Sequence, residues 1–241
     1  MAVKVILGGS GGIGLAMVKA LLDDASPIGS SQDQVIASYH HQCPSLTHPR
    51  LTWRRLDITK AASVTRFFES CQQIDWLINT IGLLHRDYAG PEKRLDQVDV
   101  AWLNESMATH LTGNVLTAQS AAAKLALSPQ AKFAVLSAKV GSISDNQLGG
   151  WYSYRCSKAA LNMFIKTLSI EWRRQMPNVT ILALHPGTTD TALSKPFQGR
   201  VPAHQLQSAE SVAAQLIALI DAASPDDTGR FIDYQGRDLG W

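Results

Sequence analysis

A tyrosine and a lysine four residues apart could form an acid–base pair. The segment Tyr154-Arg155-Cys156-Ser157-Lys158, if helical, places a phenol and an ammonium one turn apart on the same face. A nearby cation favours the phenolate, so we expect Lys158 to lower the pKa of Tyr154 from its usual value of about 10. Tyr154 could then pass a proton to or from a substrate oxygen.

A glycine-rich segment near the start of the chain could bind phosphate. It reads Gly8-Gly9-Ser10-Gly11-Gly12-Ile13-Gly14 and follows a short apolar run directly. Glycines let the backbone turn sharply and approach a pyrophosphate, whose charge is met by free N–H groups where a helix begins. Such a loop between a strand and a helix predicts dinucleotide binding, with a purely structural turn as the alternative.

Both features depend on elements that alternate along the whole chain. We predict strands at Lys4–Leu7, Val35–Tyr39, Thr52–Leu56, Trp76–Asn79, Phe133–Ser137, Thr180–His185 and Arg230–Asp233. We predict helices at Gly12–Asp24, Lys60–Cys71, Val100–Leu127, Tyr152–Gln175 and Ser208–Ala222. This alternation is typical of βαβ units and predicts an α/β fold of the Rossmann type, with a doubly wound, mostly parallel sheet of seven strands and helices on both faces.

Composition limits the domain count and the class of partner. With 241 residues, 45% hydrophobic and 17% charged, the chain is expected to fold as one domain over residues 1–241. Its 22 basic and 20 acidic residues are scattered, which argues against nucleic acid as a partner. No apolar run approaches the roughly 18 residues that cross a bilayer, so we expect no membrane partner and a cytoplasmic location.

The cysteines and histidines do not form a recognisable metal site. Cys43, Cys71 and Cys156 are far apart and are expected to be reduced thiols. Three histidines and a cysteine gather within residues 40–48, but a proline-rich loop would supply no rigid geometry, so we expect no metal.

Two connections are long for a compact α/β domain. They span residues 83–99 and 187–207, and each follows a predicted strand whose carboxyl end should face the same side. Ligands of open α/β sheets bind at that side, so we expect these segments to be substrate loops, with mobile loops that bind nothing as the alternative.

Along its whole length the chain resembles the short-chain dehydrogenase/reductase family. Gly8, Gly12 and Gly14 match that family's T-G-x-x-x-G-x-G, with Leu7 in place of the threonine. The segment Asn79-Thr80-Ile81-Gly82 resembles its N-N-A-G, Asp57 resembles the acid that contacts adenine, and Pro186-Gly187 with Thr191 matches P-G-x-x-x-T, which would hold the nicotinamide carboxamide. The stretches Ser137–Ser142, Tyr152–Arg155 and Phe231–Trp241 look most like the C-factor and sniffer-like carbonyl reductase branch.

The resemblance implies a set of cofactor-binding residues. They are Gly8, Ser10, Gly12, Ile13, Gly14, Ser38, His40, Asp57, Ile58, Asn79, Gly82, Tyr154, Lys158, Pro186, Gly187, Thr189 and Thr191. Lys158 would bond the nicotinamide ribose as well as lower the tyrosine pKa.

Two departures from the family pattern concern catalytic residues. Ala138 stands where the family's catalytic serine usually lies, and either Ser137 or Ser142 could replace it by donating to a substrate carbonyl. We expect Ser142 to do so, with loop backbone bonding as the alternative for each. His110 stands where the family has an asparagine that relays protons to the lysine, and it could relay protons or simply be packed.

The residues at the end of the second predicted strand indicate the cofactor. Enzymes that bind NAD commonly place a carboxylate there, and residues 34–42 contain none. Ser38, Tyr39, His40 and Ser10 instead offer hydrogen-bond donors to a 2′-phosphate. We expect NADP(H) to be preferred, with NAD(H) as the alternative.

The sequence thus predicts an oxidoreductase that transfers a hydride between a nicotinamide and a small-molecule carbonyl or secondary alcohol. A dinucleotide-binding regulatory or signalling protein with little turnover is the main alternative, and a dehydratase or epimerase that uses the same cofactor is the second. Because such proteins commonly pair the helices corresponding to Val100–Leu127 and Tyr152–Gln175, we expect a homodimer or homotetramer.

Overall fold

Seven parallel strands form the central sheet of the computed structural model, which describes residues 1–23, 32–202 and 205–241. Their order is β3-β2-β1-β4-β5-β6-β9, and every neighbouring pair is parallel. Their bounds are β1 Val3–Leu7, β2 Gln34–Tyr39, β3 Leu51–Arg55, β4 Trp76–Asn79, β5 Ala131–Leu136, β6 Val179–His185 and β9 Arg230–Asp233. The predicted doubly wound α/β sheet of seven strands is therefore confirmed.

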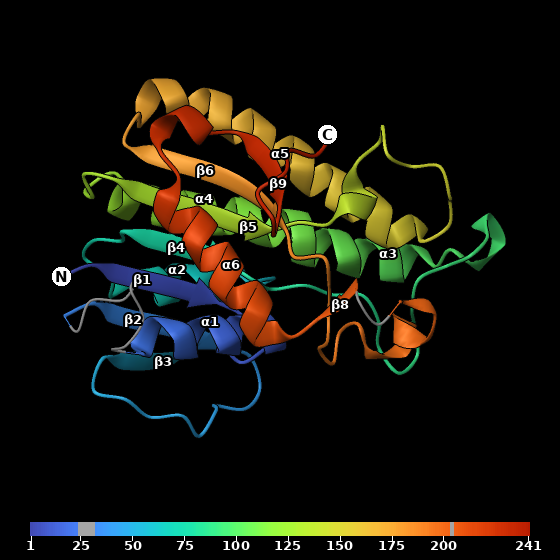
Figure 1. The fold of residues 1–241 in the computed structure, drawn as a ribbon, viewed down its shortest axis with the longest axis horizontal. Helices are drawn as coiled ribbons and strands as arrows, with labels where there is room; N and C mark the ends of the chain where they lie inside the picture. The colour runs from blue at the N-terminus through green and yellow to red at the C-terminus, as the bar shows by residue number, and fades with distance from the viewer. Residues whose placement is uncertain (24–31, 203–204) are drawn as a thin grey trace.

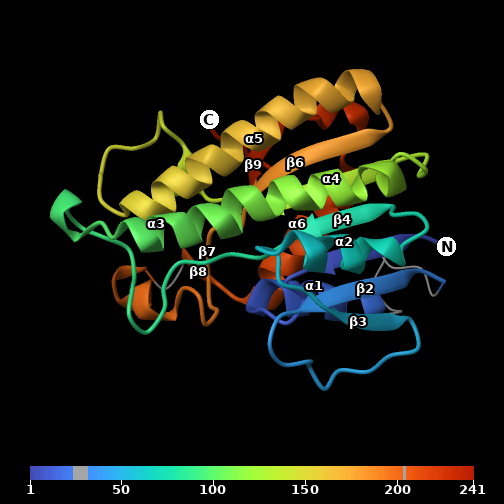
Figure 2. The same ribbon diagram turned by 180° about the vertical axis from the view of Figure 1, so that it is seen from behind.

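Helices cover both faces of this sheet (Figures 1 and 2). Helices α1 (Gly12–Leu22) and α6 (Ala209–Ala222) lie on one face. Helices α2 (Ala61–Glu69), α4 (Gly113–Leu125) and α5 (Tyr152–Gln175) lie on the other. Helix α3 (Val100–Met107) continues α4 beyond the sheet and packs beside the start of α5.

Each face of the sheet has its own apolar layer. On one face, Met17 of α1 and Leu216 of α6 are fully buried against the sheet. On the other face, Phe67 of α2 and Leu161 and Trp172 of α5 are buried. Because strands in the middle of the sheet are covered on both faces, β5 is buried at all six positions and shows no alternation of polar and apolar residues.

One predicted helix differs from the structure in its interior. The expected single helix over Val100–Leu127 consists of α3, a π-helical segment at Ala108–Thr112 and α4. π-helical turns are rare and interrupt an α-helix for only about one turn, so the helical periodicity of the whole segment does not reveal this one. Asp24, the predicted end of the first helix, lies outside the described residues.

The carboxyl ends of the parallel strands lie at one edge of the sheet, where the two long connections gather (Figure 1). The second connection holds a two-stranded ribbon, β7 (Thr188–Thr189) and β8 (Leu206–Gln207), and a short 3₁₀ helix at Lys195–Arg200. This edge is the one at which open α/β sheets bind ligands.

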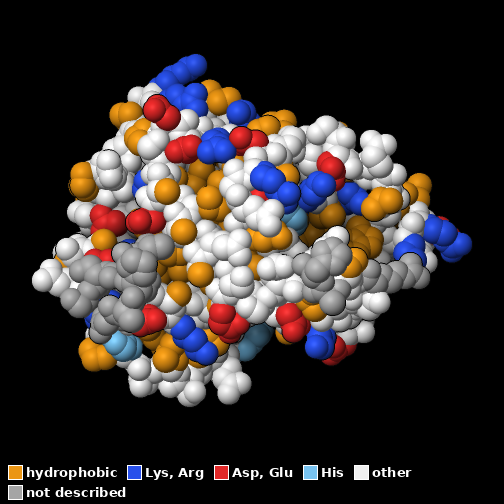
Figure 3. All heavy atoms as spheres, viewed as in Figure 1, with side chains coloured by type: hydrophobic (Ala, Val, Ile, Leu, Met, Phe, Trp, Pro, Cys, Tyr) orange, Lys and Arg blue, Asp and Glu red, His pale blue; other side chains and the backbone are white. Residues whose placement is uncertain are grey.

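The surface carries no large block of one charge on the face that Figure 3 shows, where basic and acidic side chains are interspersed. Among the helices of the described residues, none is long and apolar enough to cross a membrane.

Candidate active site

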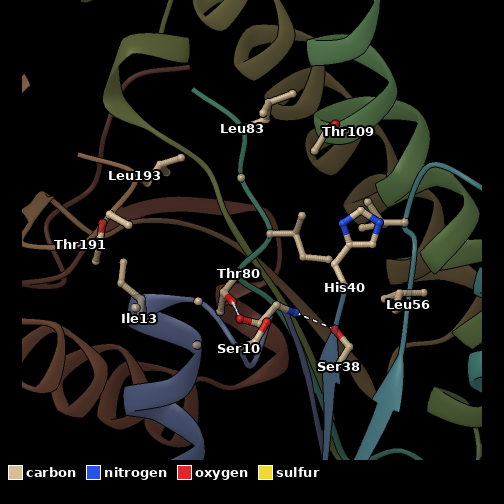
Figure 4. Close-up of a pocket in the computed structure, with 18 of the residues that line it drawn as sticks. Ser10, Ile13, Ser38, His40, Leu56, Thr80, Leu83, Thr109, Thr191 and Leu193 are labelled. Carbon is tan, nitrogen blue, oxygen red and sulfur yellow. Dashed lines mark hydrogen bonds between the residues drawn. The ribbon is translucent and has the colours of Figure 1, made fainter. Parts of the chain in front are cut away.

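A cavity of about 330 Å³ lies at the carboxyl edge of the sheet, and Figure 4 shows its lining. The glycine loop and the ends of β2, β3 and β4 form its walls, and residues 191–193 of the second long connection close over it. Ser10 and Ser38 lie near the strand ends, while Leu83 and Leu193 lie toward the opposite side of the cavity (Figure 4).

The glycine loop presents the amino end of α1 to this cavity. Gly8 has a φ of 80°, which glycine adopts readily, and its carbonyl accepts a hydrogen bond from the backbone N–H of Gly11 at 2.9 Å. Helix α1 has no side-chain cap and no acidic residue in its first turn. Its first N–H groups are therefore available to an anion, as a dinucleotide pyrophosphate requires.

Most of the predicted cofactor residues line the cavity. They are Gly8, Ser10, Gly12, Ile13, Gly14, Ser38, His40, Asp57, Ile58, Gly82 and Thr191. The other predicted cofactor residues are not among the described residues that line the cavity; they are Asn79, Tyr154, Lys158, Pro186, Gly187 and Thr189. Lining residues that the sequence analysis missed include Gly11, Leu56, Thr59, Thr80, Ile81, Leu83, Arg86, Thr109, Ala192 and Leu193.

Asn79 supports the cavity wall from behind. It is fully buried, its amide donates to Asn114 Oδ1 at 2.8 Å, and its Oδ1 accepts from the backbone N–H of Ile81 at 3.0 Å. Asn79 thus fixes the chain after β4, and its contact with the cofactor stays a prediction.

Two predicted residues at the strand ends differ in what they can offer a ligand. The hydroxyl of Ser38 is buried and accepts a hydrogen bond from the Gly8 N–H at 2.8 Å, so it holds the glycine loop. Burial opposes ionisation of Asp57, but hydrogen bonds from the Thr59 side chain and backbone outweigh it and lower the pKa of the carboxyl. Asp57 is thus a carboxylate at neutral pH, able to accept from an adenine amino group.

Tyr154 and Lys158 lie one turn apart on α5, as predicted. The Lys158 Nζ is 5.8 Å from the centre of the Tyr154 ring and donates to the carbonyl of Leu136 at 2.9 Å. Gly141 lets the loop after β5 pack directly on Lys158, since a Cβ there would lie 2.8 Å from the Lys158 Cβ. Lys158 is 2% exposed and Tyr154 is half-buried.

The expected fall in the tyrosine pKa is wrong for the protein without ligand. Burial raises the pKa of Tyr154 and lowers the pKa of Lys158 to about 7, because desolvation disfavours the charged form of each group. At neutral pH Tyr154 is a neutral phenol, which is the form that can donate a proton to a carbonyl oxygen.

The two serines proposed to replace Ala138 are both engaged inside the protein. The hydroxyl of Ser137 donates to Asn162 Oδ1 at 2.5 Å. The hydroxyl of Ser142 lies 3.3 Å from the carbonyl oxygen of Trp241 and accepts from the backbone N–H of Asp145 at 3.2 Å. The structure thus brings neither hydroxyl to Tyr154 by a hydrogen bond within the described residues.

His110 lies in the π-helical segment and has both ring nitrogens occupied. Its Nε2 accepts from the backbone N–H of Leu83 at 2.9 Å, so Nδ1 carries the proton and donates to the Ser157 hydroxyl at 2.8 Å. Burial lowers the pKa of His110 well below its usual value. His110 thus links the cavity wall to α5, and the predicted relay of protons would require one of these two hydrogen bonds to break.

His110 also contacts Tyr154 directly. The His110 ring meets the Tyr154 ring edge-on with centres 5.5 Å apart, and Leu83, which donates to His110, lines the cavity. The His110 side chain alone therefore lies between Tyr154 and Leu83 of the cavity wall.

The start of α5 is held by a residue that the sequence analysis missed. The carboxylate of Glu92 accepts from the backbone N–H of Ser153 at 3.1 Å and from its hydroxyl, and the Glu92 carbonyl accepts from the backbone N–H of Trp151. Trp151 has a left-handed φ of 53°. Because Glu92 lies 61 residues from Ser153, no local sequence signal could have revealed this contact.

Aromatic rings extend from Tyr154 into both long connections. Trp151 lies 6.1 Å from Tyr154 and 5.4 Å from Phe197, and Phe197 lies 5.8 Å from His85, all between ring centres. The two predicted substrate loops thus meet beside Tyr154.

Comparison with known proteins shows relatives over most of the chain. The short chain dehydrogenase family model matches residues 2–200. A 1-hydroxy-2-glutathionyl-2-methyl-3-butene dehydrogenase of Rhodococcus sp. (strain AD45) is 32% identical over 190 residues, covering 77% of this chain and 78% of that protein. The C-signal protein of Myxococcus xanthus is 33% identical over 168 residues, covering 70% of this chain and 93% of that protein.

The fold has a solved counterpart in the NADPH-bound carbonyl reductase from chicken fatty liver. The two share a TM-score of 0.84 and 24% identity, with 100% of each chain covered. The family indicated by the glycine loop and the Tyr154–Lys158 pair is confirmed by the family model and by the curated relatives: the chain belongs to the short-chain dehydrogenase family.

Proposed function

We propose that this NAD(P)-dependent oxidoreductase reduces a small-molecule carbonyl, or oxidises the corresponding secondary alcohol, with NADP(H) as its preferred cofactor. The observation that carries the proposal is the placement of Tyr154 and Lys158 beside a cavity whose wall is an uncapped helix start. A nicotinamide bound in this cavity would supply or accept the hydride. The chicken carbonyl reductase with NADPH bound supports the choice of cofactor.

Tyr154 handles the proton of the substrate oxygen. In reduction the neutral phenol donates its proton to the carbonyl oxygen and becomes a phenolate; in oxidation the phenolate takes the proton back. The Lys158 cation favours the phenolate, and burial of both groups strengthens the attraction between the two charges when they form.

Several further roles are part of the proposal. Residues 83–99 and 187–207 form the substrate loops within one domain, and Trp151, Phe197 and His85 line the approach to Tyr154. A cytoplasmic location and a homodimer or homotetramer stay predictions. Met163 and Ile170, which are 65% and 48% exposed and lie two turns apart on α5, support pairing through that helix.

The test of the function is turnover with a panel of aldehydes, ketones and quinones. We expect NADPH to be oxidised in step with carbonyl loss. A regulatory dinucleotide-binding protein would bind NADPH without oxidising any of the panel, and a dehydratase or epimerase would form product without net NADPH loss.

We expect NADPH to bind more tightly than NADH. Residues 34–42 contain no carboxylate that would repel a 2′-phosphate, and His40 lines the cavity. Titration of each reduced cofactor by the change in its fluorescence measures both affinities. Equal binding, or tighter binding of NADH, would overturn the assignment of the cofactor.

The hydroxyls of Ser137 and Ser142 both make hydrogen bonds within the protein, so we expect their replacement by alanine to have little effect on turnover. Ser137→Ala and Ser142→Ala should each keep turnover close to that of the wild type under saturating NADPH, because each hydroxyl already bonds groups of the protein. Removal of a true oxyanion donor typically costs on the order of 10² in turnover. A loss of that size in Ser142→Ala alone would restore the role expected from the sequence.

A further inference from the structure

Three left-handed residues directly precede the helix that carries Tyr154. Gly149, Gly150 and Trp151 have φ angles of 64°, 63° and 53°. Glycine adopts this conformation readily, but a Cβ atom disfavours it, so Trp151 keeps it only if contacts with other parts of the fold hold the residue there.

The start of α5 has no cap from its own sequence. Trp151, the residue before the helix, makes no side-chain hydrogen bond to it, and the first turn contains no acidic residue. The first N–H groups of a helix have no partner within that helix. The start of α5 therefore depends on acceptors from another part of the chain.

Glu92, in the first long connection, supplies these acceptors. It is 5% exposed, and its carbonyl oxygen accepts from the Trp151 N–H. Its carboxylate accepts from the Ser153 N–H at 3.1 Å and from the Ser153 hydroxyl. The amino end of a helix also favours a negative charge. One buried residue thus holds the chain on both sides of Tyr152.

The two residues that Glu92 holds both adjoin Tyr154. Ser153 precedes it in the chain, and the Trp151 ring lies 6.1 Å from the Tyr154 ring between centres. Within the described residues no hydrogen bond joins Glu92 to Tyr154 itself. Glu92 can therefore act on Tyr154 only through the position of Trp151 and Ser153.

Glu92 also lines a hollow between the two long connections. The hollow has a volume of about 550 Å³, and its lining includes His85 from the first connection and Pro196 and Phe197 from the second. The residue that fixes the start of α5 is thus part of the wall between the proposed substrate loops.

We propose that Glu92 is a positioning residue for proton transfer by Tyr154, an inference that rests on the proposed oxidoreductase function. Its carboxylate fixes the first turn of α5 and thereby the place of the phenol hydroxyl relative to the substrate oxygen. A small misplacement of a reacting group is enough to slow a reaction strongly. The cofactor cavity does not include Glu92, so its loss should affect the reaction and not the binding of NADPH.

Replacement of Glu92 separates these two effects. Glu92→Ala removes the carboxylate and keeps the backbone carbonyl that accepts from Trp151. It should lower kcat, measured at saturating NADPH and carbonyl, by about tenfold, because Tyr154 is no longer held in place. The affinity for NADPH, measured by fluorescence titration, should remain unchanged.

Glu92→Gln tests whether hydrogen-bond geometry is the cause. Its amide oxygen can accept from the Ser153 N–H while its amide nitrogen donates to the Ser153 hydroxyl, so both contacts are kept without the charge. We expect kcat within about twofold of the wild type, a recovery that a loss of catalysis unrelated to these contacts would not give.

Ser208→Ala is the matched control. The Ser208 hydroxyl caps α6 by accepting from the Ser211 N–H at 3.1 Å. Its loss removes a helix cap, so thermal unfolding should show a lower Tm, as for Glu92→Ala, but kcat should stay unchanged. All assays are made well below the lowest unfolding temperature of the set.

A second variant reaches the same contact if Glu92→Ala does not fold. A Cβ added at Gly150 would lie 3.3 Å from the Glu92 carbonyl oxygen, at a left-handed φ. Gly150→Ala should therefore displace Trp151 and lower kcat without changing the affinity for NADPH. Unchanged kcat in this variant would overturn the inference.

The outcomes separate this inference from the proposed function. If the wild type reduces carbonyls and Glu92→Ala keeps its kcat, the inference is wrong and the oxidoreductase function stands. A failure of Glu92→Gln to recover kcat, or a parallel loss of NADPH affinity in Glu92→Ala, would also contradict a positioning role. If the wild type reduces no carbonyl of the panel, the proposed function is wrong, and the inference is wrong with it.

Discussion

Tyr154→Phe should lower the turnover of carbonyl reduction by about 10²-fold or more, the size expected when general acid catalysis is lost. The variant keeps the aromatic ring that meets His110 and Trp151 and removes only the hydroxyl that carries the proton. Because the variant keeps the ring and its packing against His110 and Trp151, the affinity for NADPH should remain nearly intact. Turnover under saturating NADPH and a separate fluorescence titration measure the two quantities.

Tyr152→Phe provides the matched control for this experiment. Tyr152 lies on the same helix, two residues earlier, and is 36% exposed. Its loss should leave turnover near that of the wild type. Unchanged turnover in Tyr154→Phe would end the proposed mechanism, and an equal loss in both variants would point to damage at the start of α5.

Lys158→Met should weaken both turnover and NADPH binding, because the cation is proposed to act on Tyr154 and on the nicotinamide ribose. Burial disfavours the ammonium, so the methionine variant should be no less stable at neutral pH than the wild type, which thermal unfolding checks. Lys166→Met, two turns along α5 at an exposed position, is the control and should change neither quantity. A change confined to substrate affinity would contradict the dual role.

The pH dependence of the wild type offers a second readout of the same residue. Burial lowers the pKa of Lys158 to about 7, so the ammonium is present below that pH and is lost as the pH rises through it. The value of kcat/KM for NADPH reports groups of the free enzyme and should fall over this range in the wild type. Lys158→Met should lack this step, and a step that persists unchanged would assign it to another group.

The elements that carry the site could be predicted because their signals are local. The bounds of α5 agree with the predicted Tyr152–Gln175, since its buried residues recur at helical spacing over the whole length. The glycine loop was found for a similar reason: its function depends on backbone freedom at neighbouring positions. Eleven of the predicted cofactor-binding residues line the cavity. Most of them belong to the glycine loop or stand at or directly after the ends of β2, β3 and β4.

The parts that could not be predicted depend on contacts between distant residues. The role of Glu92 needs the fold to bring it to the start of α5, and the engagement of Ser142 needs the fold to bring it to Trp241. The pKa of Tyr154 depends on how deeply the pair is buried, which helical spacing does not indicate.

Transfer of label from the cofactor tests the central claim most directly. NADPH that carries deuterium on the transferred position of its C4 is incubated with the purified protein and the best carbonyl of the panel, and the alcohol is examined by mass spectrometry and NMR. The account predicts one deuterium for each NADPH oxidised, on the carbon that was the carbonyl carbon. An alcohol without deuterium, or product formed while NADPH remains unoxidised, would contradict it.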